Sequence, residues 1–150
     1  MNPSLIVLVT PNVVLRWNKN GITVAGNGTT NNTSSILMGP YGFTLDSSKT
    51  LYIAEYHGHR VTKWTVGAST SVIIAGSLNG TLGNGTNGFY HPLDVLVESN
   101  GDMYVTDRYN HRLQYWRNGA TSATTIASMY YKPRDFNILL KTQVFKLIFS

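Results

Sequence analysis

The amino-acid sequence predicts an all-β fold made of repeated four-stranded units, and three observations support this prediction. Only 13% of the 150 residues are charged and 14 are glycine, a composition that favours turn-rich β structure over helical bundles. Short apolar runs are separated by turn signals, such as DSSK at 46–49 and ESNGD at 98–102. In addition, the sequence repeats itself at an interval of 52 residues.

The repeat runs without a gap over the residues between positions 40 and 75. The identities at this interval include Pro40 with Pro92, Tyr52 with Tyr104, His59 with His111, Arg60 with Arg112, Trp64 with Trp116 and Ala75 with Ala127. Chance does not supply so coherent a set. A third, partial copy lies upstream, where RWNKNGITVAGNG at 16–28 parallels residues 63–80 with a shorter turn.

Each unit contains four short strands by its sequence pattern. In the unit that begins near residue 37 they are YGFTLD, TLYIAE, RVTKW and SVIIAG. The alternation in RVTKW places Val61 and Lys63 on one face of the strand and Trp64 on the other. The run VIIA is continuously apolar, which predicts a strand that is buried on both faces.

Four strands in about 50 residues are the sequence signature of a β-propeller blade. Because propellers have about four to eight blades, we expect a partial β-propeller of four-stranded antiparallel blades, too short for a complete ring. The propeller fragment is assigned to 1–128, with blade units at about 1–28 (partial), 37–76 and 89–128. Residues 129–150 do not match and form a basic, apolar C-terminal tail. Closing the ring requires further blades or self-association.

The segment FYHPLDVLVESNGDMYVTDRYNHRLQYW at 89–116 resembles the NHL repeat, and its NHRL run is close to the motif that names this family. The preceding unit, 37–64, resembles it more loosely, with Glu55 and Gly58 where the family usually has Asp and Asn. The resemblance implies blades of a propeller, commonly a six-bladed one. Similar propellers include binders of protein or single-stranded RNA, and lactonases and a peptide-amidating lyase that use a metal in the channel.

An acid and an arginine recur in both units, as Glu55 with Arg60 and Asp107 with Arg112. In each unit the acid ends one strand and the arginine begins the next, across a tight turn, so a charge-assisted hydrogen bond can fix the hairpin. A catalytic site would occur once and combine residues of several blades. We therefore interpret these four residues as a structural clasp. Trp17, Trp64 and Trp116 likewise occupy equivalent places, which predicts packing within the blades.

The turns beside the clasp differ between the units and are the candidate binding surface. Tyr56 and His57 in one unit correspond to Arg108 and Tyr109 in the other. Function in propellers lies in such loops, so we predict a binding or scaffold module for a protein partner. No catalytic residue, metal ligand or cofactor is predicted, although His57 and His59 alternate as metal ligands could.

Two alternatives stay open. Single-stranded RNA could bind a basic face made by Arg108, Arg112 and Arg117, with Tyr109 stacking on a base. The chain could also be a fragment of a propeller enzyme of the lactonase or amidating-lyase type, in which acids and histidines from several blades would converge. The net charge of +5 is weak evidence for nucleic-acid binding, because much of it lies in the C-terminal tail.

The loops between the units carry two further patterns. GNGTNG at 83–88 has the form of a dinucleotide-binding motif, but Pro92 and a strand follow it where that motif requires a helix. The N-glycosylation sequons, all in these loops, begin at Asn27, Asn31, Asn32, Asn79 and Asn84. They favour an extracellular or luminal setting over the cytoplasm. The N-terminus does not read as a signal peptide, and no apolar run is long enough to span a membrane.

Overall fold

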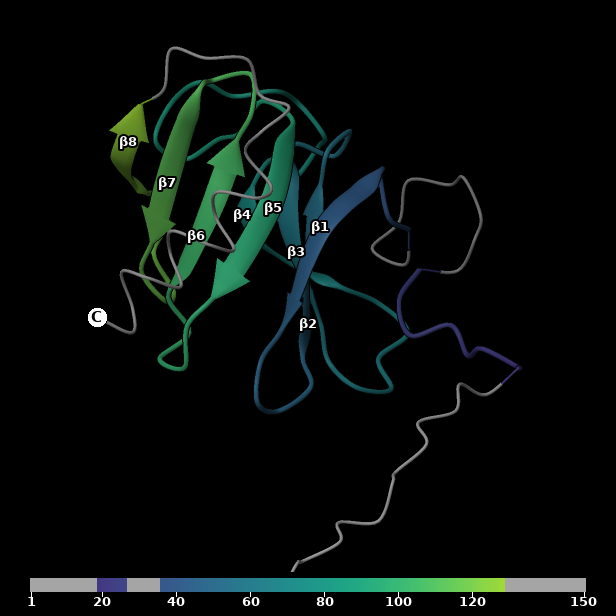
Figure 1. Ribbon diagram of the computed structural model, residues 1–150. Helices are drawn as coiled ribbons and strands as arrows, with labels where there is room; N and C mark the ends of the chain where they lie inside the picture. Colours follow the sequence, from purple (N-terminus) through teal and green to yellow (C-terminus); the bar gives the residue numbers. More distant parts are fainter. Residues whose placement is uncertain (1–18, 27–35, 129–150) are drawn as a thin grey trace, which may run out of the picture.

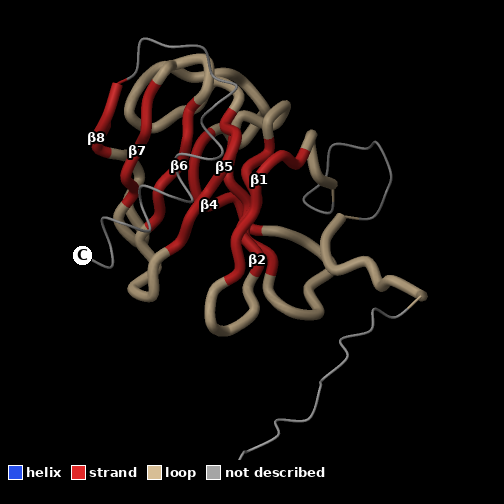
Figure 2. The backbone as a smooth tube through the Cα atoms, viewed as in Figure 1, coloured by secondary structure: helices blue, strands red, loops and turns tan. Residues whose placement is uncertain are grey.

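The computed structural model describes residues 19–26 and 36–128, and in these residues it contains strands and loops without a helix (Figures 1 and 2). The first sheet consists of β1 (Pro40–Leu45), β2 (Leu51–Glu55), β3 (Arg60–Trp64) and β4 (Val72–Gly76). The second consists of β5 (Pro92–Val97), β6 (Met103–Asp107), β7 (Arg112–Trp116) and β8 (Thr124–Ser128). The predicted all-β class of four-stranded antiparallel blades is confirmed.

Each sheet is a meander in which consecutive strands pair antiparallel. The 52-residue repeat extends to the irregularities of the ladders. A register shift between Pro40 and Gly42 in the first sheet matches one between Pro92 and Asp94 in the second. The third strand of each sheet also has a shift at the same position, after Val61 and after its equivalent Leu113. The two sheets are therefore copies in backbone geometry as well as in sequence.

The two sheets pack face to face, with β5 of the second lying against β1 and β2 of the first (Figure 1). The shared core takes its buried side chains from both sheets. They are Tyr52, Ala54, Val61 and Ala75 from the first sheet, and Phe89, Val95, Met103, Val105, Trp116 and Ala123 from the second sheet and the loops beside it. The described strands form two adjacent blades and do not close a ring. Among the described residues, no apolar helix has the length that a membrane crossing requires.

The expectation that the VIIA strand is buried on both faces is wrong. This strand is β4, the outermost of its sheet, where Val72 is 64% exposed and Ile73 and Ile74 are only partly buried. An edge strand has a neighbour on one side only, so a continuous apolar run does not ensure burial there. Trp64 and Trp116 are buried, at 2% and 1% exposure, whereas Trp17 lies outside the described residues.

The two sheets approach each other very closely at Gly42 in β1. A Cβ atom added there would lie 2.5 Å from the Leu93 carbonyl oxygen and would also overlap the Asp94 side chain. Atoms of a rigid backbone cannot move away cheaply, so only glycine allows β1 to approach β5 this closely. The contact fixes the distance between the inner edges of the two blades.

We expect Gly42→Val to lower the free energy of unfolding by about 2 kcal/mol, because the added side chain forces the blades apart. Urea denaturation followed by tryptophan fluorescence measures this change. The control is Gly21→Ala, since a Cβ at Gly21 meets nothing within 4 Å. Equal stability of the two variants would show that the blades do not pack at this distance.

Candidate functional site

The acid and the arginine of each unit form a buried ion pair across the turn between the second and third strands. Arg60 Nε donates to Glu55 Oε2 at 3.0 Å, and Arg112 Nε donates to Asp107 Oδ2 at 2.8 Å. Both carboxylates are completely buried. In each hairpin the acid is also the strand partner of its arginine, so the ion pair closes the last rung of the ladder.

Each carboxylate also holds the segment that leads into the first strand of its sheet. Glu55 accepts a hydrogen bond from the backbone N–H of Met38 at 3.1 Å, and Asp107 accepts one from that of Tyr90 at 2.7 Å. Met38 and Tyr90 are 52 residues apart, as the repeat requires. The acid therefore joins three parts of the blade: the leading segment, the turn and the third strand.

In the second blade the ion pair extends to the GNGTNG loop. Arg112 donates to the carbonyl oxygens of Asn84, Gly85 and Gly88 at 2.7–3.0 Å. Asn110 bridges Asp107 and the carbonyl of Gly83, both at 2.8 Å. The loop leads into β5, and three of its carbonyls are occupied by a cation of the same chain. It thus serves the connection between the blades.

Burial raises the pKa of Asp107 above its ordinary value, although hydrogen bonds from Asn110, the Tyr90 N–H and Arg112 act in the opposite direction. The desolvation of a buried ion pair largely offsets its Coulomb attraction. The net stability that the pair adds is therefore small compared with the loss expected if one partner were removed. Its main contribution is to specify the geometry of the turn.

The turns beside the two ion pairs meet at one rim of the molecule. We use the name rim cluster for Tyr56, His57, His91, Arg108 and Tyr109. The Arg108 guanidinium lies over the rings of Tyr56 and Tyr109, at 5.8 Å and 5.2 Å from their centroids. Tyr56 and Tyr109 are 6.5 Å apart, centroid to centroid, and Tyr109 is 44% exposed. The four residues proposed from the sequence therefore lie together across the boundary between the blades.

Sequence reasoning missed His91, which joins the two halves of this cluster. Its ring stacks on Tyr56 with a centroid distance of 4.0 Å, and its Nδ1–H donates to the Tyr56 carbonyl at 2.8 Å. His91 has a positive φ of 56°, and the equivalent residue of the first blade is Gly39, with a φ of 64°. The sequence did contain a signal for His91, because the other copy of the repeat has a glycine at the equivalent position.

His59, the residue before Arg60, also belongs to this boundary. The His91 backbone N–H donates to His59 Nδ1 at 3.1 Å, which requires that nitrogen to be unprotonated. Burial lowers the pKa of His59, and the nearby His91 and His57 lower it further. His59 is 8% exposed, whereas its repeat equivalent His111 is exposed. The second blade therefore covers His59.

The three arginines named for an RNA-binding face do not share one surface. Arg112 is buried and its nitrogens are engaged by Asp107 and the loop carbonyls. Arg117 follows the end of β7, whereas Arg108 precedes its beginning. The length of the strand separates the two, so Arg108 alone of the three contributes to the rim cluster.

The other sequence-based candidates lie apart from the rim cluster. The described residues contain no group of three His, Cys, Asp or Glu side chains that could hold a metal ion. The sequon residues Asn79 and Asn84 are exposed in the loop between β4 and β5, and Asn27, Asn31 and Asn32 lie outside the described residues.

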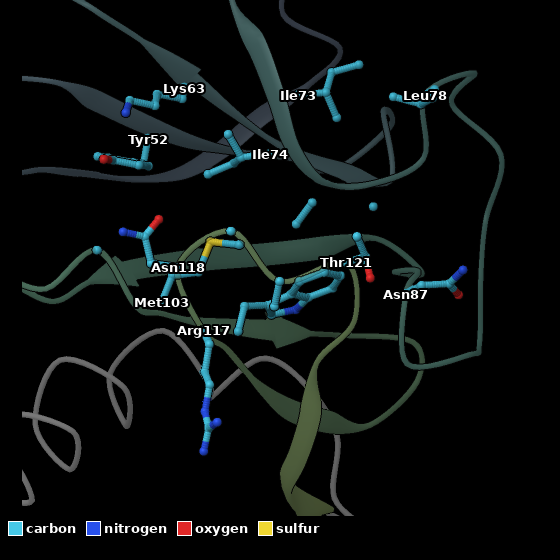
Figure 3. Close-up of a pocket in the computed structure, with 16 residues that line it drawn as sticks. Tyr52, Lys63, Ile73, Ile74, Leu78, Asn87, Met103, Arg117, Asn118 and Thr121 are labelled. Atoms are coloured by element: carbon cyan, nitrogen blue, oxygen red, sulfur yellow. The ribbon is translucent and has the colours of Figure 1, made fainter.

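A cleft of about 600 Å³ opens between the two sheets near the opposite ends of the strands. Figure 3 shows Tyr52, Lys63 and Ile74 on the side of the first sheet and Met103, Arg117 and Asn118 on the side of the second. Its lining contains no carboxylate and no histidine. The groups that general acid–base catalysis uses most are therefore absent from this lining.

Replacing Asp107 by asparagine keeps the size of the side chain but leaves Arg112 buried without its anion. We expect a loss of about 3–5 kcal/mol in unfolding free energy, the usual effect of removing one partner of a buried pair. Urea denaturation measures it, and Glu98→Gln, at a partly exposed acid, is the control. A loss below about 1 kcal/mol for Asp107→Asn would contradict the clasp.

Stability should depend on pH through His59. Folding favours the neutral form of His59. In the unfolded chain its imidazole has the ordinary pKa of 6.5, so the unfolded chain binds more protons than the folded one. The contribution of His59 is complete above that pH and is lost as the pH falls below it. Denaturation midpoints between pH 8 and pH 5 measure the loss. His59→Asn keeps an acceptor and tolerates the φ of 51°, so this variant should lose less stability over the same range.

One stretch of the chain matches a known family. The NHL repeat model matches residues 89–115, which confirms the resemblance found in the sequence. No curated protein sequence matches the chain. Similar solved structures include a streptogramin B lyase and virginiamycin B lyase from Staphylococcus aureus.

The streptogramin B lyase is 18% identical, with a TM-score of 0.43, and the match covers 62% of this chain and 27% of that one. The virginiamycin B lyase is 11% identical, with a TM-score of 0.31, and the match covers 69% of this chain and 45% of that one. The chain thus spans less than half the length of either structure. Residues 89–115 thus match the NHL repeat, and the described strands form two adjacent four-stranded sheets with the antiparallel order of blades in a partial β-propeller.

Proposed function

We propose that the chain is a binding module and that the rim cluster contacts a protein partner. The observation that supports this most is the convergence of Tyr56, Tyr109 and Arg108 from two blades on one rim. Tyrosine and arginine are enriched among the residues that contribute most to protein interfaces. Tyr41 extends the surface, since its ring lies 5.1 Å from that of Tyr56 and it is 60% exposed.

The rim cluster is held in place before any partner binds. Arg108 Nη1 donates weakly to the Tyr56 hydroxyl at 3.5 Å, and the ring faces support the guanidinium. Arg108 Nε is buried without a hydrogen-bond partner within the described residues. A partner carbonyl or carboxylate at the rim would accept hydrogen bonds from the terminal nitrogens of the guanidinium. A preorganised arginine loses little side-chain entropy on binding, which favours affinity.

Single-stranded RNA is the second candidate, because tyrosine rings and an arginine can stack on bases. It is less well supported, since Arg112 and Arg117 do not join Arg108 at the rim. Binding in preference to catalysis is supported by the cleft between the sheets, whose lining offers neither carboxylate nor histidine.

A random peptide library displayed on phage, selected on the immobilised protein, provides the probe. We expect Arg108→Ala and Tyr109→Ala to weaken the selected peptides by about tenfold or more, the effect of losing a contact worth about 1.4 kcal/mol. Arg117→Ala is the matched control, because this exposed arginine lies at the other end of β7. Fluorescence anisotropy of labelled peptides measures the affinities.

Two outcomes would contradict the proposal. Selected peptides that bind equally well to the Arg108→Ala variant would place the binding surface elsewhere. Tight binding of a mixed-sequence single-stranded RNA, with affinity that falls steeply between two salt concentrations and depends on Arg108, would favour the RNA alternative.

A further inference from the structure

The first sheet has an apolar face that the second sheet does not cover. Phe43 is 64% exposed and Leu45 is 57% exposed, although both belong to β1. They line a groove of about 1160 Å³ between this sheet and residues 22–25, whose wall also includes Leu51 and the buried side chains of Ile53 and Trp64. Large exposed apolar surfaces mark sites of association.

The repeat shows what kind of surface fits this face. The residues 52 positions later are Val95, Val97, Met103, Val105 and Trp116. In the second sheet these five residues pack against the first sheet, where they meet Tyr52, Ala54 and Val61. The open face of the first sheet therefore has the same design as a face that already binds a blade.

The second sheet carries the matching surface on the side that faces away from the first sheet. Its residues Tyr104, Leu113, Tyr115 and Ile126 are equivalent to Tyr52, Val61, Lys63 and Ile74 of the first sheet. Ile126 is 49% exposed, and Tyr104, Leu113 and Tyr115 are only partly buried. His111 also points to a missing neighbour on this side. It has the same φ of 51° as its equivalent His59, but it is exposed, whereas the second sheet covers His59.

We propose that this chain binds a second copy of itself head to tail, with the open face of the β5–β8 sheet of one copy docking on the open face of the β1–β4 sheet of the other. The contact would reproduce the junction between the two blades within one chain. Such an interface joins different surfaces of the two copies and leads to a ring when the rotation closes. A propeller of four to eight blades would then contain about two to four copies of a two-bladed unit.

The charges at the two faces are complementary. Within the chain, Gly101 and Tyr52 both line the cleft between the sheets, and the Tyr52 hydroxyl donates to Asp46. The repeat places Lys49 at the position of Gly101 and Glu98 at the position of Asp46. Lys49 is exposed at the apolar groove. In the docked pair, Lys49 of one copy would therefore lie near Tyr104 and Glu98 of the other.

Residues 22–26 lie beside the open face of the first sheet and must yield to the docking sheet. Gly26 lies against Leu37, and Gly76, at the end of β4, lies against Phe89, which is the repeat equivalent of Leu37. Residues 22–26 therefore occupy the place where the last strand of a preceding blade would run. It is not paired as a strand, and its Ile22 and Val24 are 86% and 67% exposed. In the docked pair, a strand of the second copy would take the place of this segment.

Sedimentation velocity of the full chain over a hundredfold concentration range tests the proposal. We expect reversible, concentration-dependent association above the monomer mass of 16.6 kDa. Phe43→Glu should abolish it without unfolding the chain, because the side chain is mostly exposed. Arg117→Ala is the control and should leave association unchanged, because its repeat equivalent, Thr65, does not line the cleft between the two sheets. Phe43 lies outside the rim cluster, so the outcome is independent of the function proposed for that cluster.

A charge exchange distinguishes the specific contact from general aggregation. Lys49→Glu and Glu98→Lys should each weaken association, by about threefold or more given the modest strength of exposed pairs. The double variant Lys49→Glu/Glu98→Lys should restore it. A monomer at every concentration would overturn the proposal and indicate that other residues of the chain or another protein cover the face. Association that Phe43→Glu leaves unchanged, or that the double variant fails to restore, would overturn it as well.

Discussion

The buried acid–arginine pair is the constraint on which the rest of the blade depends. One carboxylate, that of Glu55 or Asp107, holds the segment before the first strand, ends the second strand and binds the arginine that begins the third. An anion buried this completely is tolerated only when its partners satisfy it. The leading segment, the turn and the third strand must therefore keep fixed positions relative to one another, and the turn residues acquire a defined place at the rim.

On this constant frame a few substitutions between the repeats give the molecule its individual surfaces. Arg108 replaces a tyrosine and Tyr109 a histidine, which brings a cation between aromatic rings at the blade boundary. His91 replaces a glycine at a backbone position with positive φ and links the two blades by stacking and hydrogen bonds. Residues shared by the repeats thus maintain the blade, and residues that differ produce the candidate binding surface.

Much of the architecture could be predicted because it is local and repeated. Strand positions follow from apolar alternation and turn residues, and the pairing of Glu55 with Arg60 follows from four intervening residues in a hairpin. The exposure of Val72 could not be predicted in the same way. Periodicity states which residues share a face of a strand, but it does not state whether another sheet covers that face.

The sequence by itself determined the class of fold, the four-stranded unit, its duplication and the residues of the clasp, because each depends on neighbours within one hairpin. Only the tertiary structure decided which faces are covered and how the turns of two blades combine. His91 meets Tyr56 and His59 across more than thirty positions of chain, and Gly42 allows β1 to approach Leu93 of the other sheet. Such contacts arise from the distance and angle between the sheets, which no local pattern specifies.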